Sequence, residues 1–128
     1  MSKDTEPAEL PDTGSRNEYS TGAVRDASLG KGHYRSIPPT VMRRLAKRFE
    51  DGSRKYEDGN WTKGIPLSNY YDSARRHMDE WLLGKSDEDH LVAAIWNLVC
   101  GGWTEEQVVD GNLPESLDDL ILRTRRDK

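Results

Sequence analysis

The stretch "SDEDHLVAAIWN", residues 86–97, decides the fold prediction. Three acids stand before a histidine, and small and apolar side chains follow without the alternation typical of a strand. Ser86 followed by Asp89 matches a capping pattern, and acids in the first turn of a helix interact favourably with its dipole. We therefore predict a helix over about 87–100. A helix that only fills a core needs neither a histidine nor an asparagine, so the same stretch also indicates a site.

The polar residues of this predicted helix lie on one stripe. Its members, spaced as helical neighbours, are Asp87, His90, Ala94 and Asn97. A similar stripe on the preceding predicted helix consists of Tyr70, Ser73, His77 and Glu80. Successive helices joined by a short turn are antiparallel neighbours, so we expect the two stripes to face each other. Beside the stripe of the second predicted helix, Ala74, Met78 and Trp81 have core character, and beside that of the third, Leu91, Ile95 and Leu98 form an apolar stripe.

Convergence of these stripes would bring oxygen and imidazole ligands together. Carboxylates with an amide oxygen suit Mg²⁺ or Mn²⁺, whereas imidazole favours Zn²⁺ or Mn²⁺. Glu80, Asp87 and Asp89 are the candidate metal ligands, and His77 and His90 are candidate catalytic groups. Acids at this place are also explained by favourable interaction with the dipole at the start of a helix. The sequence therefore leaves two interpretations open, a metal site and a stabilised helix N-terminus.

The remaining predicted elements are helical too. A first helix starts at "IPPT", 37–40, because prolines suit a first turn, and it continues to about residue 56 with Val41, Leu45 and Phe49 on one face. A second helix runs over about 69–83, with Ser68 as its N-cap.

The C-terminal part is predicted to be helical as well. Gly101-Gly102 should end the third helix, and "TEEQ" from Thr104 fits a capping box that starts a short one. "PESLDDLILRTRR", 114–126, reads as a terminal helix. No stretch has strand alternation, so the predicted fold class is all-α, a small helical bundle. We expect one helical domain over 34–128, with its core at 38–102 and C-terminal helices at 104–126.

Composition limits the size of the core. Apolar residues make up 34% and charged residues 33% of the 128 residues, which is a low apolar share for a compact domain. Residues 1–33 mix charge, Pro, Gly, Ser and Thr without an apolar period, and we expect an arm that is disordered or orders on a partner. Short helices bury little surface alone, so a homo-oligomer, a dimer or larger, is expected.

Charge and cysteine content exclude several classes of protein. A net charge of −4 with dispersed basic residues argues against a nucleic-acid-binding domain. Cys100 is the single cysteine, which excludes an intramolecular disulfide, and its place at the end of an apolar run predicts a buried, inert thiol. No secretory signal is visible, and the longest apolar stretch is about half of what spans a bilayer. A cytoplasmic protein without a membrane anchor is expected.

The loop after the first predicted helix is a second candidate site. Lys55 and Lys63 suit phosphate, and Tyr56 or Trp61 can stack on a base. The alternative is a structural role, in which Trp61 packs against the end of the bundle and the two lysines are exposed to solvent.

Three blocks resemble a known family. "GKGHYRSIPP" (30–39), "GSRKYEDGNWTKGIPLSNYYDSARRH" (52–77) and "DEDHLVAAIWNL" (87–98) resemble the phage dATP/dGTP diphosphohydrolase N-terminal domain family, a relative of MazG-like all-α nucleoside triphosphate pyrophosphohydrolases. The resemblance covers about residues 21–102. It implies hydrolysis of a purine deoxynucleoside triphosphate to monophosphate and pyrophosphate with Mg²⁺, in the cytoplasm of the host if the protein is phage-encoded. Mn²⁺ is the alternative ion that the donor types allow.

The resemblance also assigns residues. It implies that Asp89, with the two histidines, takes part in catalysis, and that the substrate is bound by Lys55, Tyr56, Asn60, Trp61, Arg76 and Asn97. The glutamate pairs usual in MazG-like enzymes are missing, since the second helix offers His77 and Glu80 instead. Two interpretations follow: a metal site rebuilt with His and Asn, or a helical module that binds a nucleotide or a protein without hydrolysis. The order Asp89-His90 is the reverse of the dipeptide in HD-type phosphohydrolases, which argues against that class.

Overall fold

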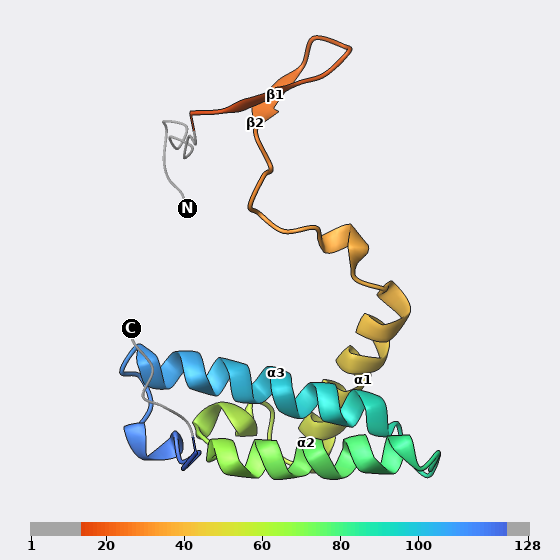
Figure 1. The fold of residues 1–128 in the computed structure, drawn as a ribbon, viewed down its shortest axis with the longest axis vertical. Helices are drawn as coiled ribbons and strands as arrows, with labels where there is room; N and C mark the ends of the chain where they lie inside the picture. The colour runs from red at the N-terminus through yellow and green to blue at the C-terminus, as the bar shows by residue number, and fades with distance from the viewer. Residues whose placement is uncertain (1–13, 123–128) are drawn as a thin grey trace. The chain divides into compact units, whose positions relative to one another are not determined.

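A computed structural model describes residues 14–122 of the chain and divides it into two units, residues 1–37 and 38–128 (Figure 1). The helical unit contains α1 (Pro39–Lys55), η2 (Asn60–Lys63), α2 (Leu67–Leu82), α3 (His90–Val109) and η3 (Glu115–Leu117). α2 and α3 run side by side as an antiparallel pair, and α1 packs against α3. The prediction of a small, mostly helical domain is therefore confirmed.

The first unit holds a short hairpin that the sequence patterns did not predict. β1 (Arg16–Glu18) pairs antiparallel with β2 (Val24–Asp26), and one helical turn, η1 (Tyr34–Ser36), follows. Strands of three residues are too short to display alternation, which is why no strand was predicted. None of the side chains described in this unit is buried. The expected arm over 1–33 stays a prediction, and residues 1–13 lie outside the described residues.

Part of each polar stripe lies in the interior between α2 and α3, namely Tyr70 of α2 and His90, Ala94 and Asn97 of α3. The buried residues of α2 are Leu67, Tyr70 and Ala74, and those of α3 are His90, Val92, Ala93, Ala94, Asn97, Cys100 and Thr104. The prediction that the stripes face each other is therefore correct. The expected core roles of Met78 and Trp81 are wrong, since these side chains are about half exposed. Small residues on the polar stripes let the helices approach closely, which leaves the large apolar residues outside.

The third helix differs from its prediction at both ends. α3 begins at His90, because Asp89 rather than Ser86 is its N-cap and accepts a hydrogen bond from the Val92 N–H at 3.3 Å. It also continues through Gly101-Gly102 and Thr104, so the separate helix expected there is the last part of α3. A Cβ at Gly101 would lie 3.4 Å from the Tyr70 Cβ, which indicates that this glycine permits close contact with α2.

Two other helix boundaries required correction. α1 begins at the prolines and ends at Lys55, as predicted, but Ser68 lies inside α2 and does not cap it. Its N–H and hydroxyl both donate to the Asp119 carboxylate, at 2.9 and 2.6 Å. The terminal helix predicted over 114–126 is wrong for its described part, 114–122, where only the turn Glu115–Leu117 is helical. The rest of that prediction lies outside the described residues.

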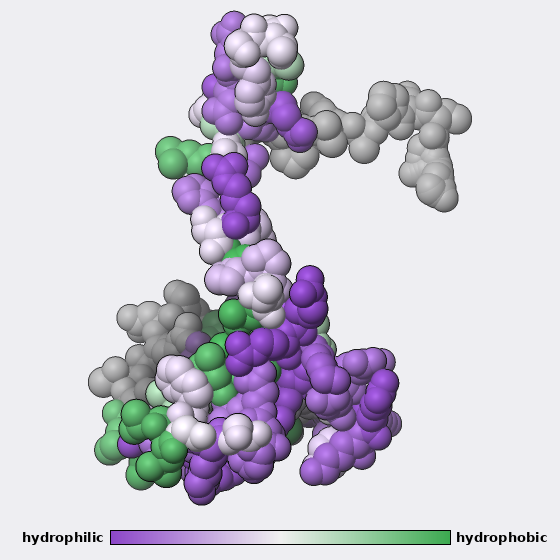
Figure 2. All heavy atoms as spheres, turned by 90° about the vertical axis from the view of Figure 1, so that its right-hand side faces the viewer, coloured by the Kyte–Doolittle hydropathy of each residue, from purple (hydrophilic) through white to green (hydrophobic). Residues whose placement is uncertain are grey.

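Apolar side chains remain on the surface of the helical unit, where Figure 2 shows them as green spheres among purple ones. The exposed apolar residues of α2 and α3 are Tyr71, Met78, Trp81, Leu82, Leu98 and Val99. No helix among residues 14–122 combines the length and the apolar character needed to cross a membrane.

Candidate functional site

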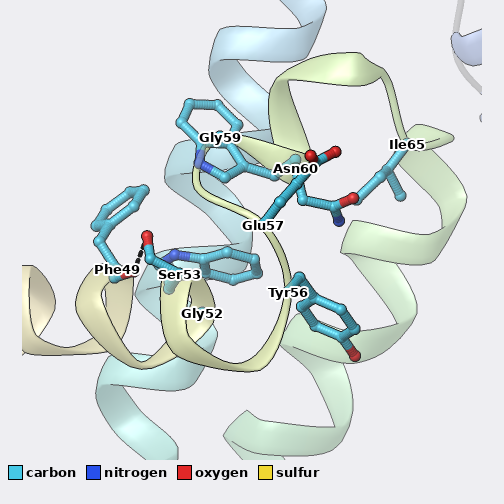
Figure 3. A pocket seen from close by; sticks show the side chains of 10 residues that line it. Phe49, Gly52, Ser53, Tyr56, Glu57, Gly59, Asn60 and Ile65 are labelled. Carbon is cyan, nitrogen blue, oxygen red and sulfur yellow. Dashed lines mark hydrogen bonds between the residues drawn. The ribbon is translucent and has the colours of Figure 1, made fainter.

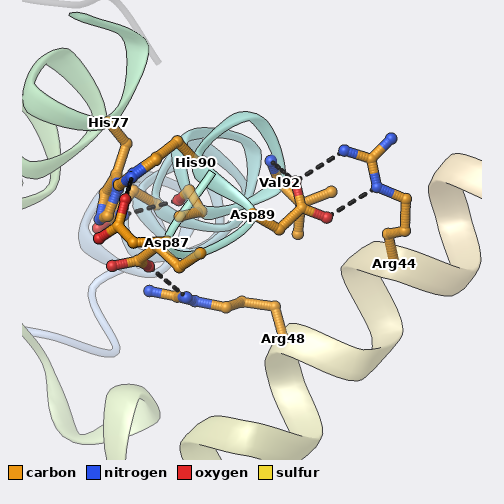
Figure 4. A network of polar contacts seen from close by, with 10 residues as sticks. Arg44, Arg48, His77, Asp87, Asp89, His90 and Val92 are labelled. Atoms are coloured by element: carbon orange, nitrogen blue, oxygen red, sulfur yellow. Dashed lines mark hydrogen bonds and ion pairs between the residues drawn. The ribbon is translucent and has the colours of Figure 1, made fainter. Parts of the chain in front are cut away.

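Two histidines meet where α2 and α3 pack together. His77 Nδ1 lies 3.0 Å from His90 Nδ1 (Figure 4). His90 is 6% exposed and His77 is half-buried. Burial lowers the pKa of His77, and the nearby Glu88 carboxylate partly opposes this shift. Two neutral imidazoles at this distance can share one proton, with one nitrogen donating and the other accepting.

Asp87 determines which nitrogen of His90 accepts. The His90 Nε2 lies 2.8 Å from the Asp87 Oδ1, where an N–H donates to the carboxylate. This hydrogen bond lowers the pKa of Asp87. A neutral His90 that carries its proton on Nε2 has a lone pair on Nδ1, directed at His77. Asp87 is therefore close to His90, as predicted. The reason given for that prediction is wrong, because Asp87 precedes α3 and is not part of a helical stripe.

Glu88 completes a group of donors with the two histidines. One ligand atom each of His77, Glu88 and His90 lies within 4.8 Å of the other two. Glu88 Oε1 also accepts a hydrogen bond from Arg48 Nη1 at 3.0 Å, which holds the carboxylate near the histidines. A carboxylate has a second oxygen and further lone pairs, so pairing with arginine and binding a cation are compatible.

The chemistry of this donor set fits a divalent metal ion. Three protein donors with open positions for water or substrate are typical of catalytic sites. Histidine held by a carboxylate on its second nitrogen is the usual arrangement around a bound metal, and Asp87 provides it for His90. Two imidazoles with one carboxylate favour Mn²⁺ or Zn²⁺ over Mg²⁺, which prefers oxygen ligands.

Asp89 has other contacts. Arg44 donates from Nε and Nη2 to the two carboxylate oxygens, each at 2.7 Å, as Figure 4 shows. These hydrogen bonds are the main reason why the pKa of Asp89 is lowered. With its capping bond to α3, Asp89 ties α1 to the start of α3. The structure therefore gives it a positioning contact, and its predicted catalytic and metal-binding roles stay predictions.

For three further predicted site residues, the structure shows no hydrogen bond or ion pair with His77 or His90. Glu80 pairs with Lys85 at 2.8 Å. Asn97 is 5% exposed and donates to the Ala93 carbonyl at 2.8 Å, so its amide serves α3 itself. Arg76 is exposed on α2, next to His77. The metal role of Glu80 and the substrate roles of Asn97 and Arg76 stay predictions.

The loop residues line a separate cavity in the helical unit (Figure 3). It has a volume of about 340 Å³, and Tyr56, Asn60 and Trp61 are among its walls, together with Phe49 and Trp96. The structure thus brings three of the predicted substrate-binding residues together. Lys55 lies outside this wall, with its Nζ 5.4 Å from the centre of the Tyr56 ring.

Several contributors were not singled out in advance. Glu88 was one of three acids in a row, and nothing in the sequence distinguishes it from its neighbours. Arg44 and Arg48 stand four residues apart, so they share a face of α1, and that spacing was the available signal. Phe49 and Trp96 appear in sequence as ordinary apolar residues.

Comparison with known proteins agrees with the sequence resemblance. The family model described as dATP/dGTP diphosphohydrolase, N-terminal, matches residues 21–112. This span includes both histidines, the three acids before α3 and the whole cavity wall. Searches of curated proteins and of solved structures returned no match. The name of the family relates the chain to dATP/dGTP diphosphohydrolases.

Proposed function

Since the chain belongs to the dATP/dGTP diphosphohydrolase N-terminal family, we propose that it hydrolyses a purine deoxynucleoside triphosphate to the monophosphate and pyrophosphate. Water attacks the α-phosphorus, the bond from that phosphorus to the bridging oxygen breaks, and pyrophosphate leaves with the electron pair. The observation that carries the proposal is the group formed by His77, Glu88 and His90, with its ligand atoms within 4.8 Å of one another.

These three side chains would hold the divalent metal ion. When bound there, such an ion neutralises phosphate charge and lowers the pKa of water. By donor type Mn²⁺ and Zn²⁺ are the candidates, and Mg²⁺, which the family resemblance implies, is to be compared with them. Asp87 keeps the Nδ1 of His90 unprotonated by accepting from Nε2, so that the lone pair faces the site.

Cationic side chains surround the site. Arg48 orients Glu88 and also places a positive charge beside it, where a phosphate would approach. Arg44 holds Asp89 and so anchors the beginning of α3, on which His90 lies. Charge held in place before the substrate arrives is the main way in which proteins favour phosphoryl transfer.

The decisive experiment is a panel of the four deoxynucleoside triphosphates, each with Mn²⁺, Mg²⁺ and Zn²⁺, with products separated by chromatography. We expect pyrophosphate from dGTP or dATP, and a loss of at least about tenfold in Glu88→Gln. The matched control is Asp72→Asn, an exposed acid on α2 away from the three donors, which should retain activity. Release of no pyrophosphate from any nucleotide with any of the three ions would refute the proposal.

Asp89→Asn is a poor probe of catalysis. This change disturbs the Arg44 pairing and weakens the N-cap of α3, so lost activity would not separate chemistry from positioning. Glu88→Gln is better, because its ion pair with Arg48 is partly exposed and contributes little to stability.

A second candidate function is nucleotide binding without hydrolysis. It is favoured by the single carboxylate in the donor group, where MazG-like enzymes use several. Calorimetry would then detect binding of a deoxynucleoside triphosphate while chromatography detects no product. Measurement of both on one preparation distinguishes the two functions.

We also propose that the chain forms a homo-oligomer. The support is the exposed apolar surface of α2 and α3, which includes Trp81, about half exposed, and Leu82, which is 80% exposed. Light scattering should give a mass of two or more chains, and Leu98→Glu should lower it. A monomer at all concentrations would contradict this proposal.

A further inference from the structure

α3 is apolar on all its sides, but the chain covers only part of it. No charged residue lies between His90 and Thr104. One side of this segment packs against α2 and another against α1. A helix that is apolar all round is normally buried on every side. Within residues 14–122, however, Leu98 is 56% exposed and Val99 is 43% exposed, so a third side of α3 has no packing partner in the single chain.

This uncovered side follows one line along the helix, which we call the outer face of α3. Its members are three or four residues apart and therefore neighbours on the helix surface: Leu91, Ile95, Leu98, Gly102 and Glu106. The first two are half-buried and the other three are exposed. The outer face is thus apolar over its first three members, has no side chain at the fourth, and ends in an acid.

The two consecutive glycines of α3 have different surroundings. A Cβ at Gly101 would lie 3.4 Å from the Tyr70 Cβ, so close packing against α2 explains this glycine. A Cβ at Gly102 would meet no atom within 4 Å. Glycine inside a helix costs about 1 kcal/mol relative to alanine. No contact among residues 14–122 offsets that cost at Gly102, whereas close approach of a helix from another molecule would, because the distance between helix axes depends on the side chains at the contact.

Charges of opposite sign mark the two ends of α3. Glu106 and Asp110 are one turn apart at its C-terminal end, and neither forms an ion pair with another described residue. At the opposite end, Arg43 and Lys47 are exposed on α1, each one residue before an arginine that binds an acid in front of α3. They too form no ion pair within the described part of the chain. Antiparallel α3 helices of two copies would therefore place the acidic end of each beside the basic end of the other, and parallel helices would place like charges together.

We propose that two copies of the chain pair through the outer faces of their α3 helices, which run antiparallel about a two-fold axis. In such a contact the same surface is used twice, so that residue i meets residue j and j meets i. Leu98 of one copy would fill the space at Gly102 of the partner subunit, and the reverse contact would form on the other side of the axis. Leu98 and Gly102 are one turn apart, a rise of about 6 Å, so both contacts fit around one axis. The inference rests on the proposed homo-oligomer and adds its interface and its orientation.

The substitution Gly102→Leu tests the close approach of the helices. The dissociation constant of the dimer is measured by sedimentation equilibrium, without nucleotide or metal ion. We expect it to rise at least tenfold, because the new side chain holds the two helices apart. An association that depends only on exposed apolar area would instead gain from an added leucine. Tighter association in this variant would therefore overturn the proposal.

Gly52→Leu is the matched control. Gly52 also lies inside a helix, and a Cβ there also meets no atom within 4 Å, but it belongs to α1 and not to the outer face. This variant should form the dimer like the unmodified chain, and circular dichroism melting should show both variants folded. Equal weakening by the two substitutions would contradict a specific contact at Gly102.

Disulfide formation tests the orientation. Leu98→Cys and Gly102→Cys chains are oxidised separately and as a mixture, and the native Cys100 is buried and should not take part. In an antiparallel pair position 98 lies opposite position 102, so the mixed disulfide should form faster than either disulfide between identical chains. In a parallel pair the identical positions are opposite each other. Faster formation of the disulfides between identical chains would overturn the antiparallel arrangement.

The outcome for this interface is separable from the outcomes for the proposed oligomer and for catalysis. A chain that is monomeric at all concentrations would refute both the oligomer and the interface. An oligomer whose dissociation constant Gly102→Leu leaves unchanged would support the oligomer and refute this interface. Neither measurement depends on whether the protein hydrolyses a nucleotide.

Discussion

Replacing Asp87 with asparagine tests whether this carboxylate prepares His90 for a metal ion. The His90 Nε2 lies 2.8 Å from the Asp87 Oδ1, and the opposite nitrogen faces His77 at 3.0 Å. Asparagine keeps an acceptor oxygen at nearly the same place but removes the negative charge. The hydrogen bond therefore weakens, and the Nδ1 of His90 becomes a poorer ligand.

The size of the effect follows from the exposure of Asp87. Loss of the partner that orients a metal-binding histidine costs about 10- to 100-fold in affinity. Because the Asp87 side chain is 73% exposed, solvent screens its charge and the lower end applies. We expect about tenfold weaker Mn²⁺ binding.

Calorimetric titration with Mn²⁺ at pH 7.5 measures this change, with Asp72→Asn as the variant of equal charge. A second readout is the ¹⁵N spectrum of the histidines without metal, where neutral His90 should carry its proton on Nε2. Equal Mn²⁺ affinity in the two variants would refute the reasoning. So would a proton found on the Nδ1 of His90.

Three further predictions concern stability and reactivity. Gly64→Ala should lower the free energy of unfolding by about 2 kcal/mol and the melting temperature by about 8–16 °C, because φ is +110° and the new Cβ would lie 2.9 Å from the Leu117 Cδ1; an unchanged melting temperature would contradict this. Burial raises the pKa of the Cys100 thiol to about 12, so iodoacetamide at pH 8 should modify the unfolded chain and spare the folded one. Equal rates in the two states would show that the thiol is accessible. Burial lowers the pKa of His77 below 6.5, so below that pH the unfolded chain takes up the proton first and the free energy of unfolding falls as the pH falls. His77→Gln should reduce the change of the unfolding free energy with pH, measured by urea titrations between pH 7 and pH 5. An identical pH dependence in the variant would contradict a lowered pKa for His77 in the folded chain.

The helices were predictable where local rules act alone. Prolines at the start of α1 and its apolar face at Val41, Leu45 and Phe49 were sufficient to define that helix. The start of α3 was not, because Ser86 and Asp89 are both good caps by residue type, and in the folded chain Asp89 is the one that caps α3 while it also pairs with Arg44. Gly101 looked like a helix end, yet its contact with Tyr70 explains its place inside α3.

The candidate site also has a part that the sequence predicted and a part that it did not. The spacing along α2 and α3 predicted that His77 and His90 lie on facing stripes, since helical periodicity places them before any tertiary contact forms. The partners of the acids were not predictable. Glu80, Asp87, Glu88 and Asp89 are equivalent by residue type, and each takes a different cation or imidazole in the folded chain.

The sequence by itself thus determined a helical fold, a polar interior between α2 and α3, and a family relation. Only the tertiary structure decided that Glu88 joins the histidines, that Asp87 supports His90, and that Asp89 serves α1. It also decided that Phe49 and Trp96, far apart in sequence, share one cavity with Tyr56 and its loop. The physical reason is that helical periodicity is a local property of the chain. Pairing between charges, and the walls of a cavity, depend instead on which side chains of separate helices come within a few ångströms of each other.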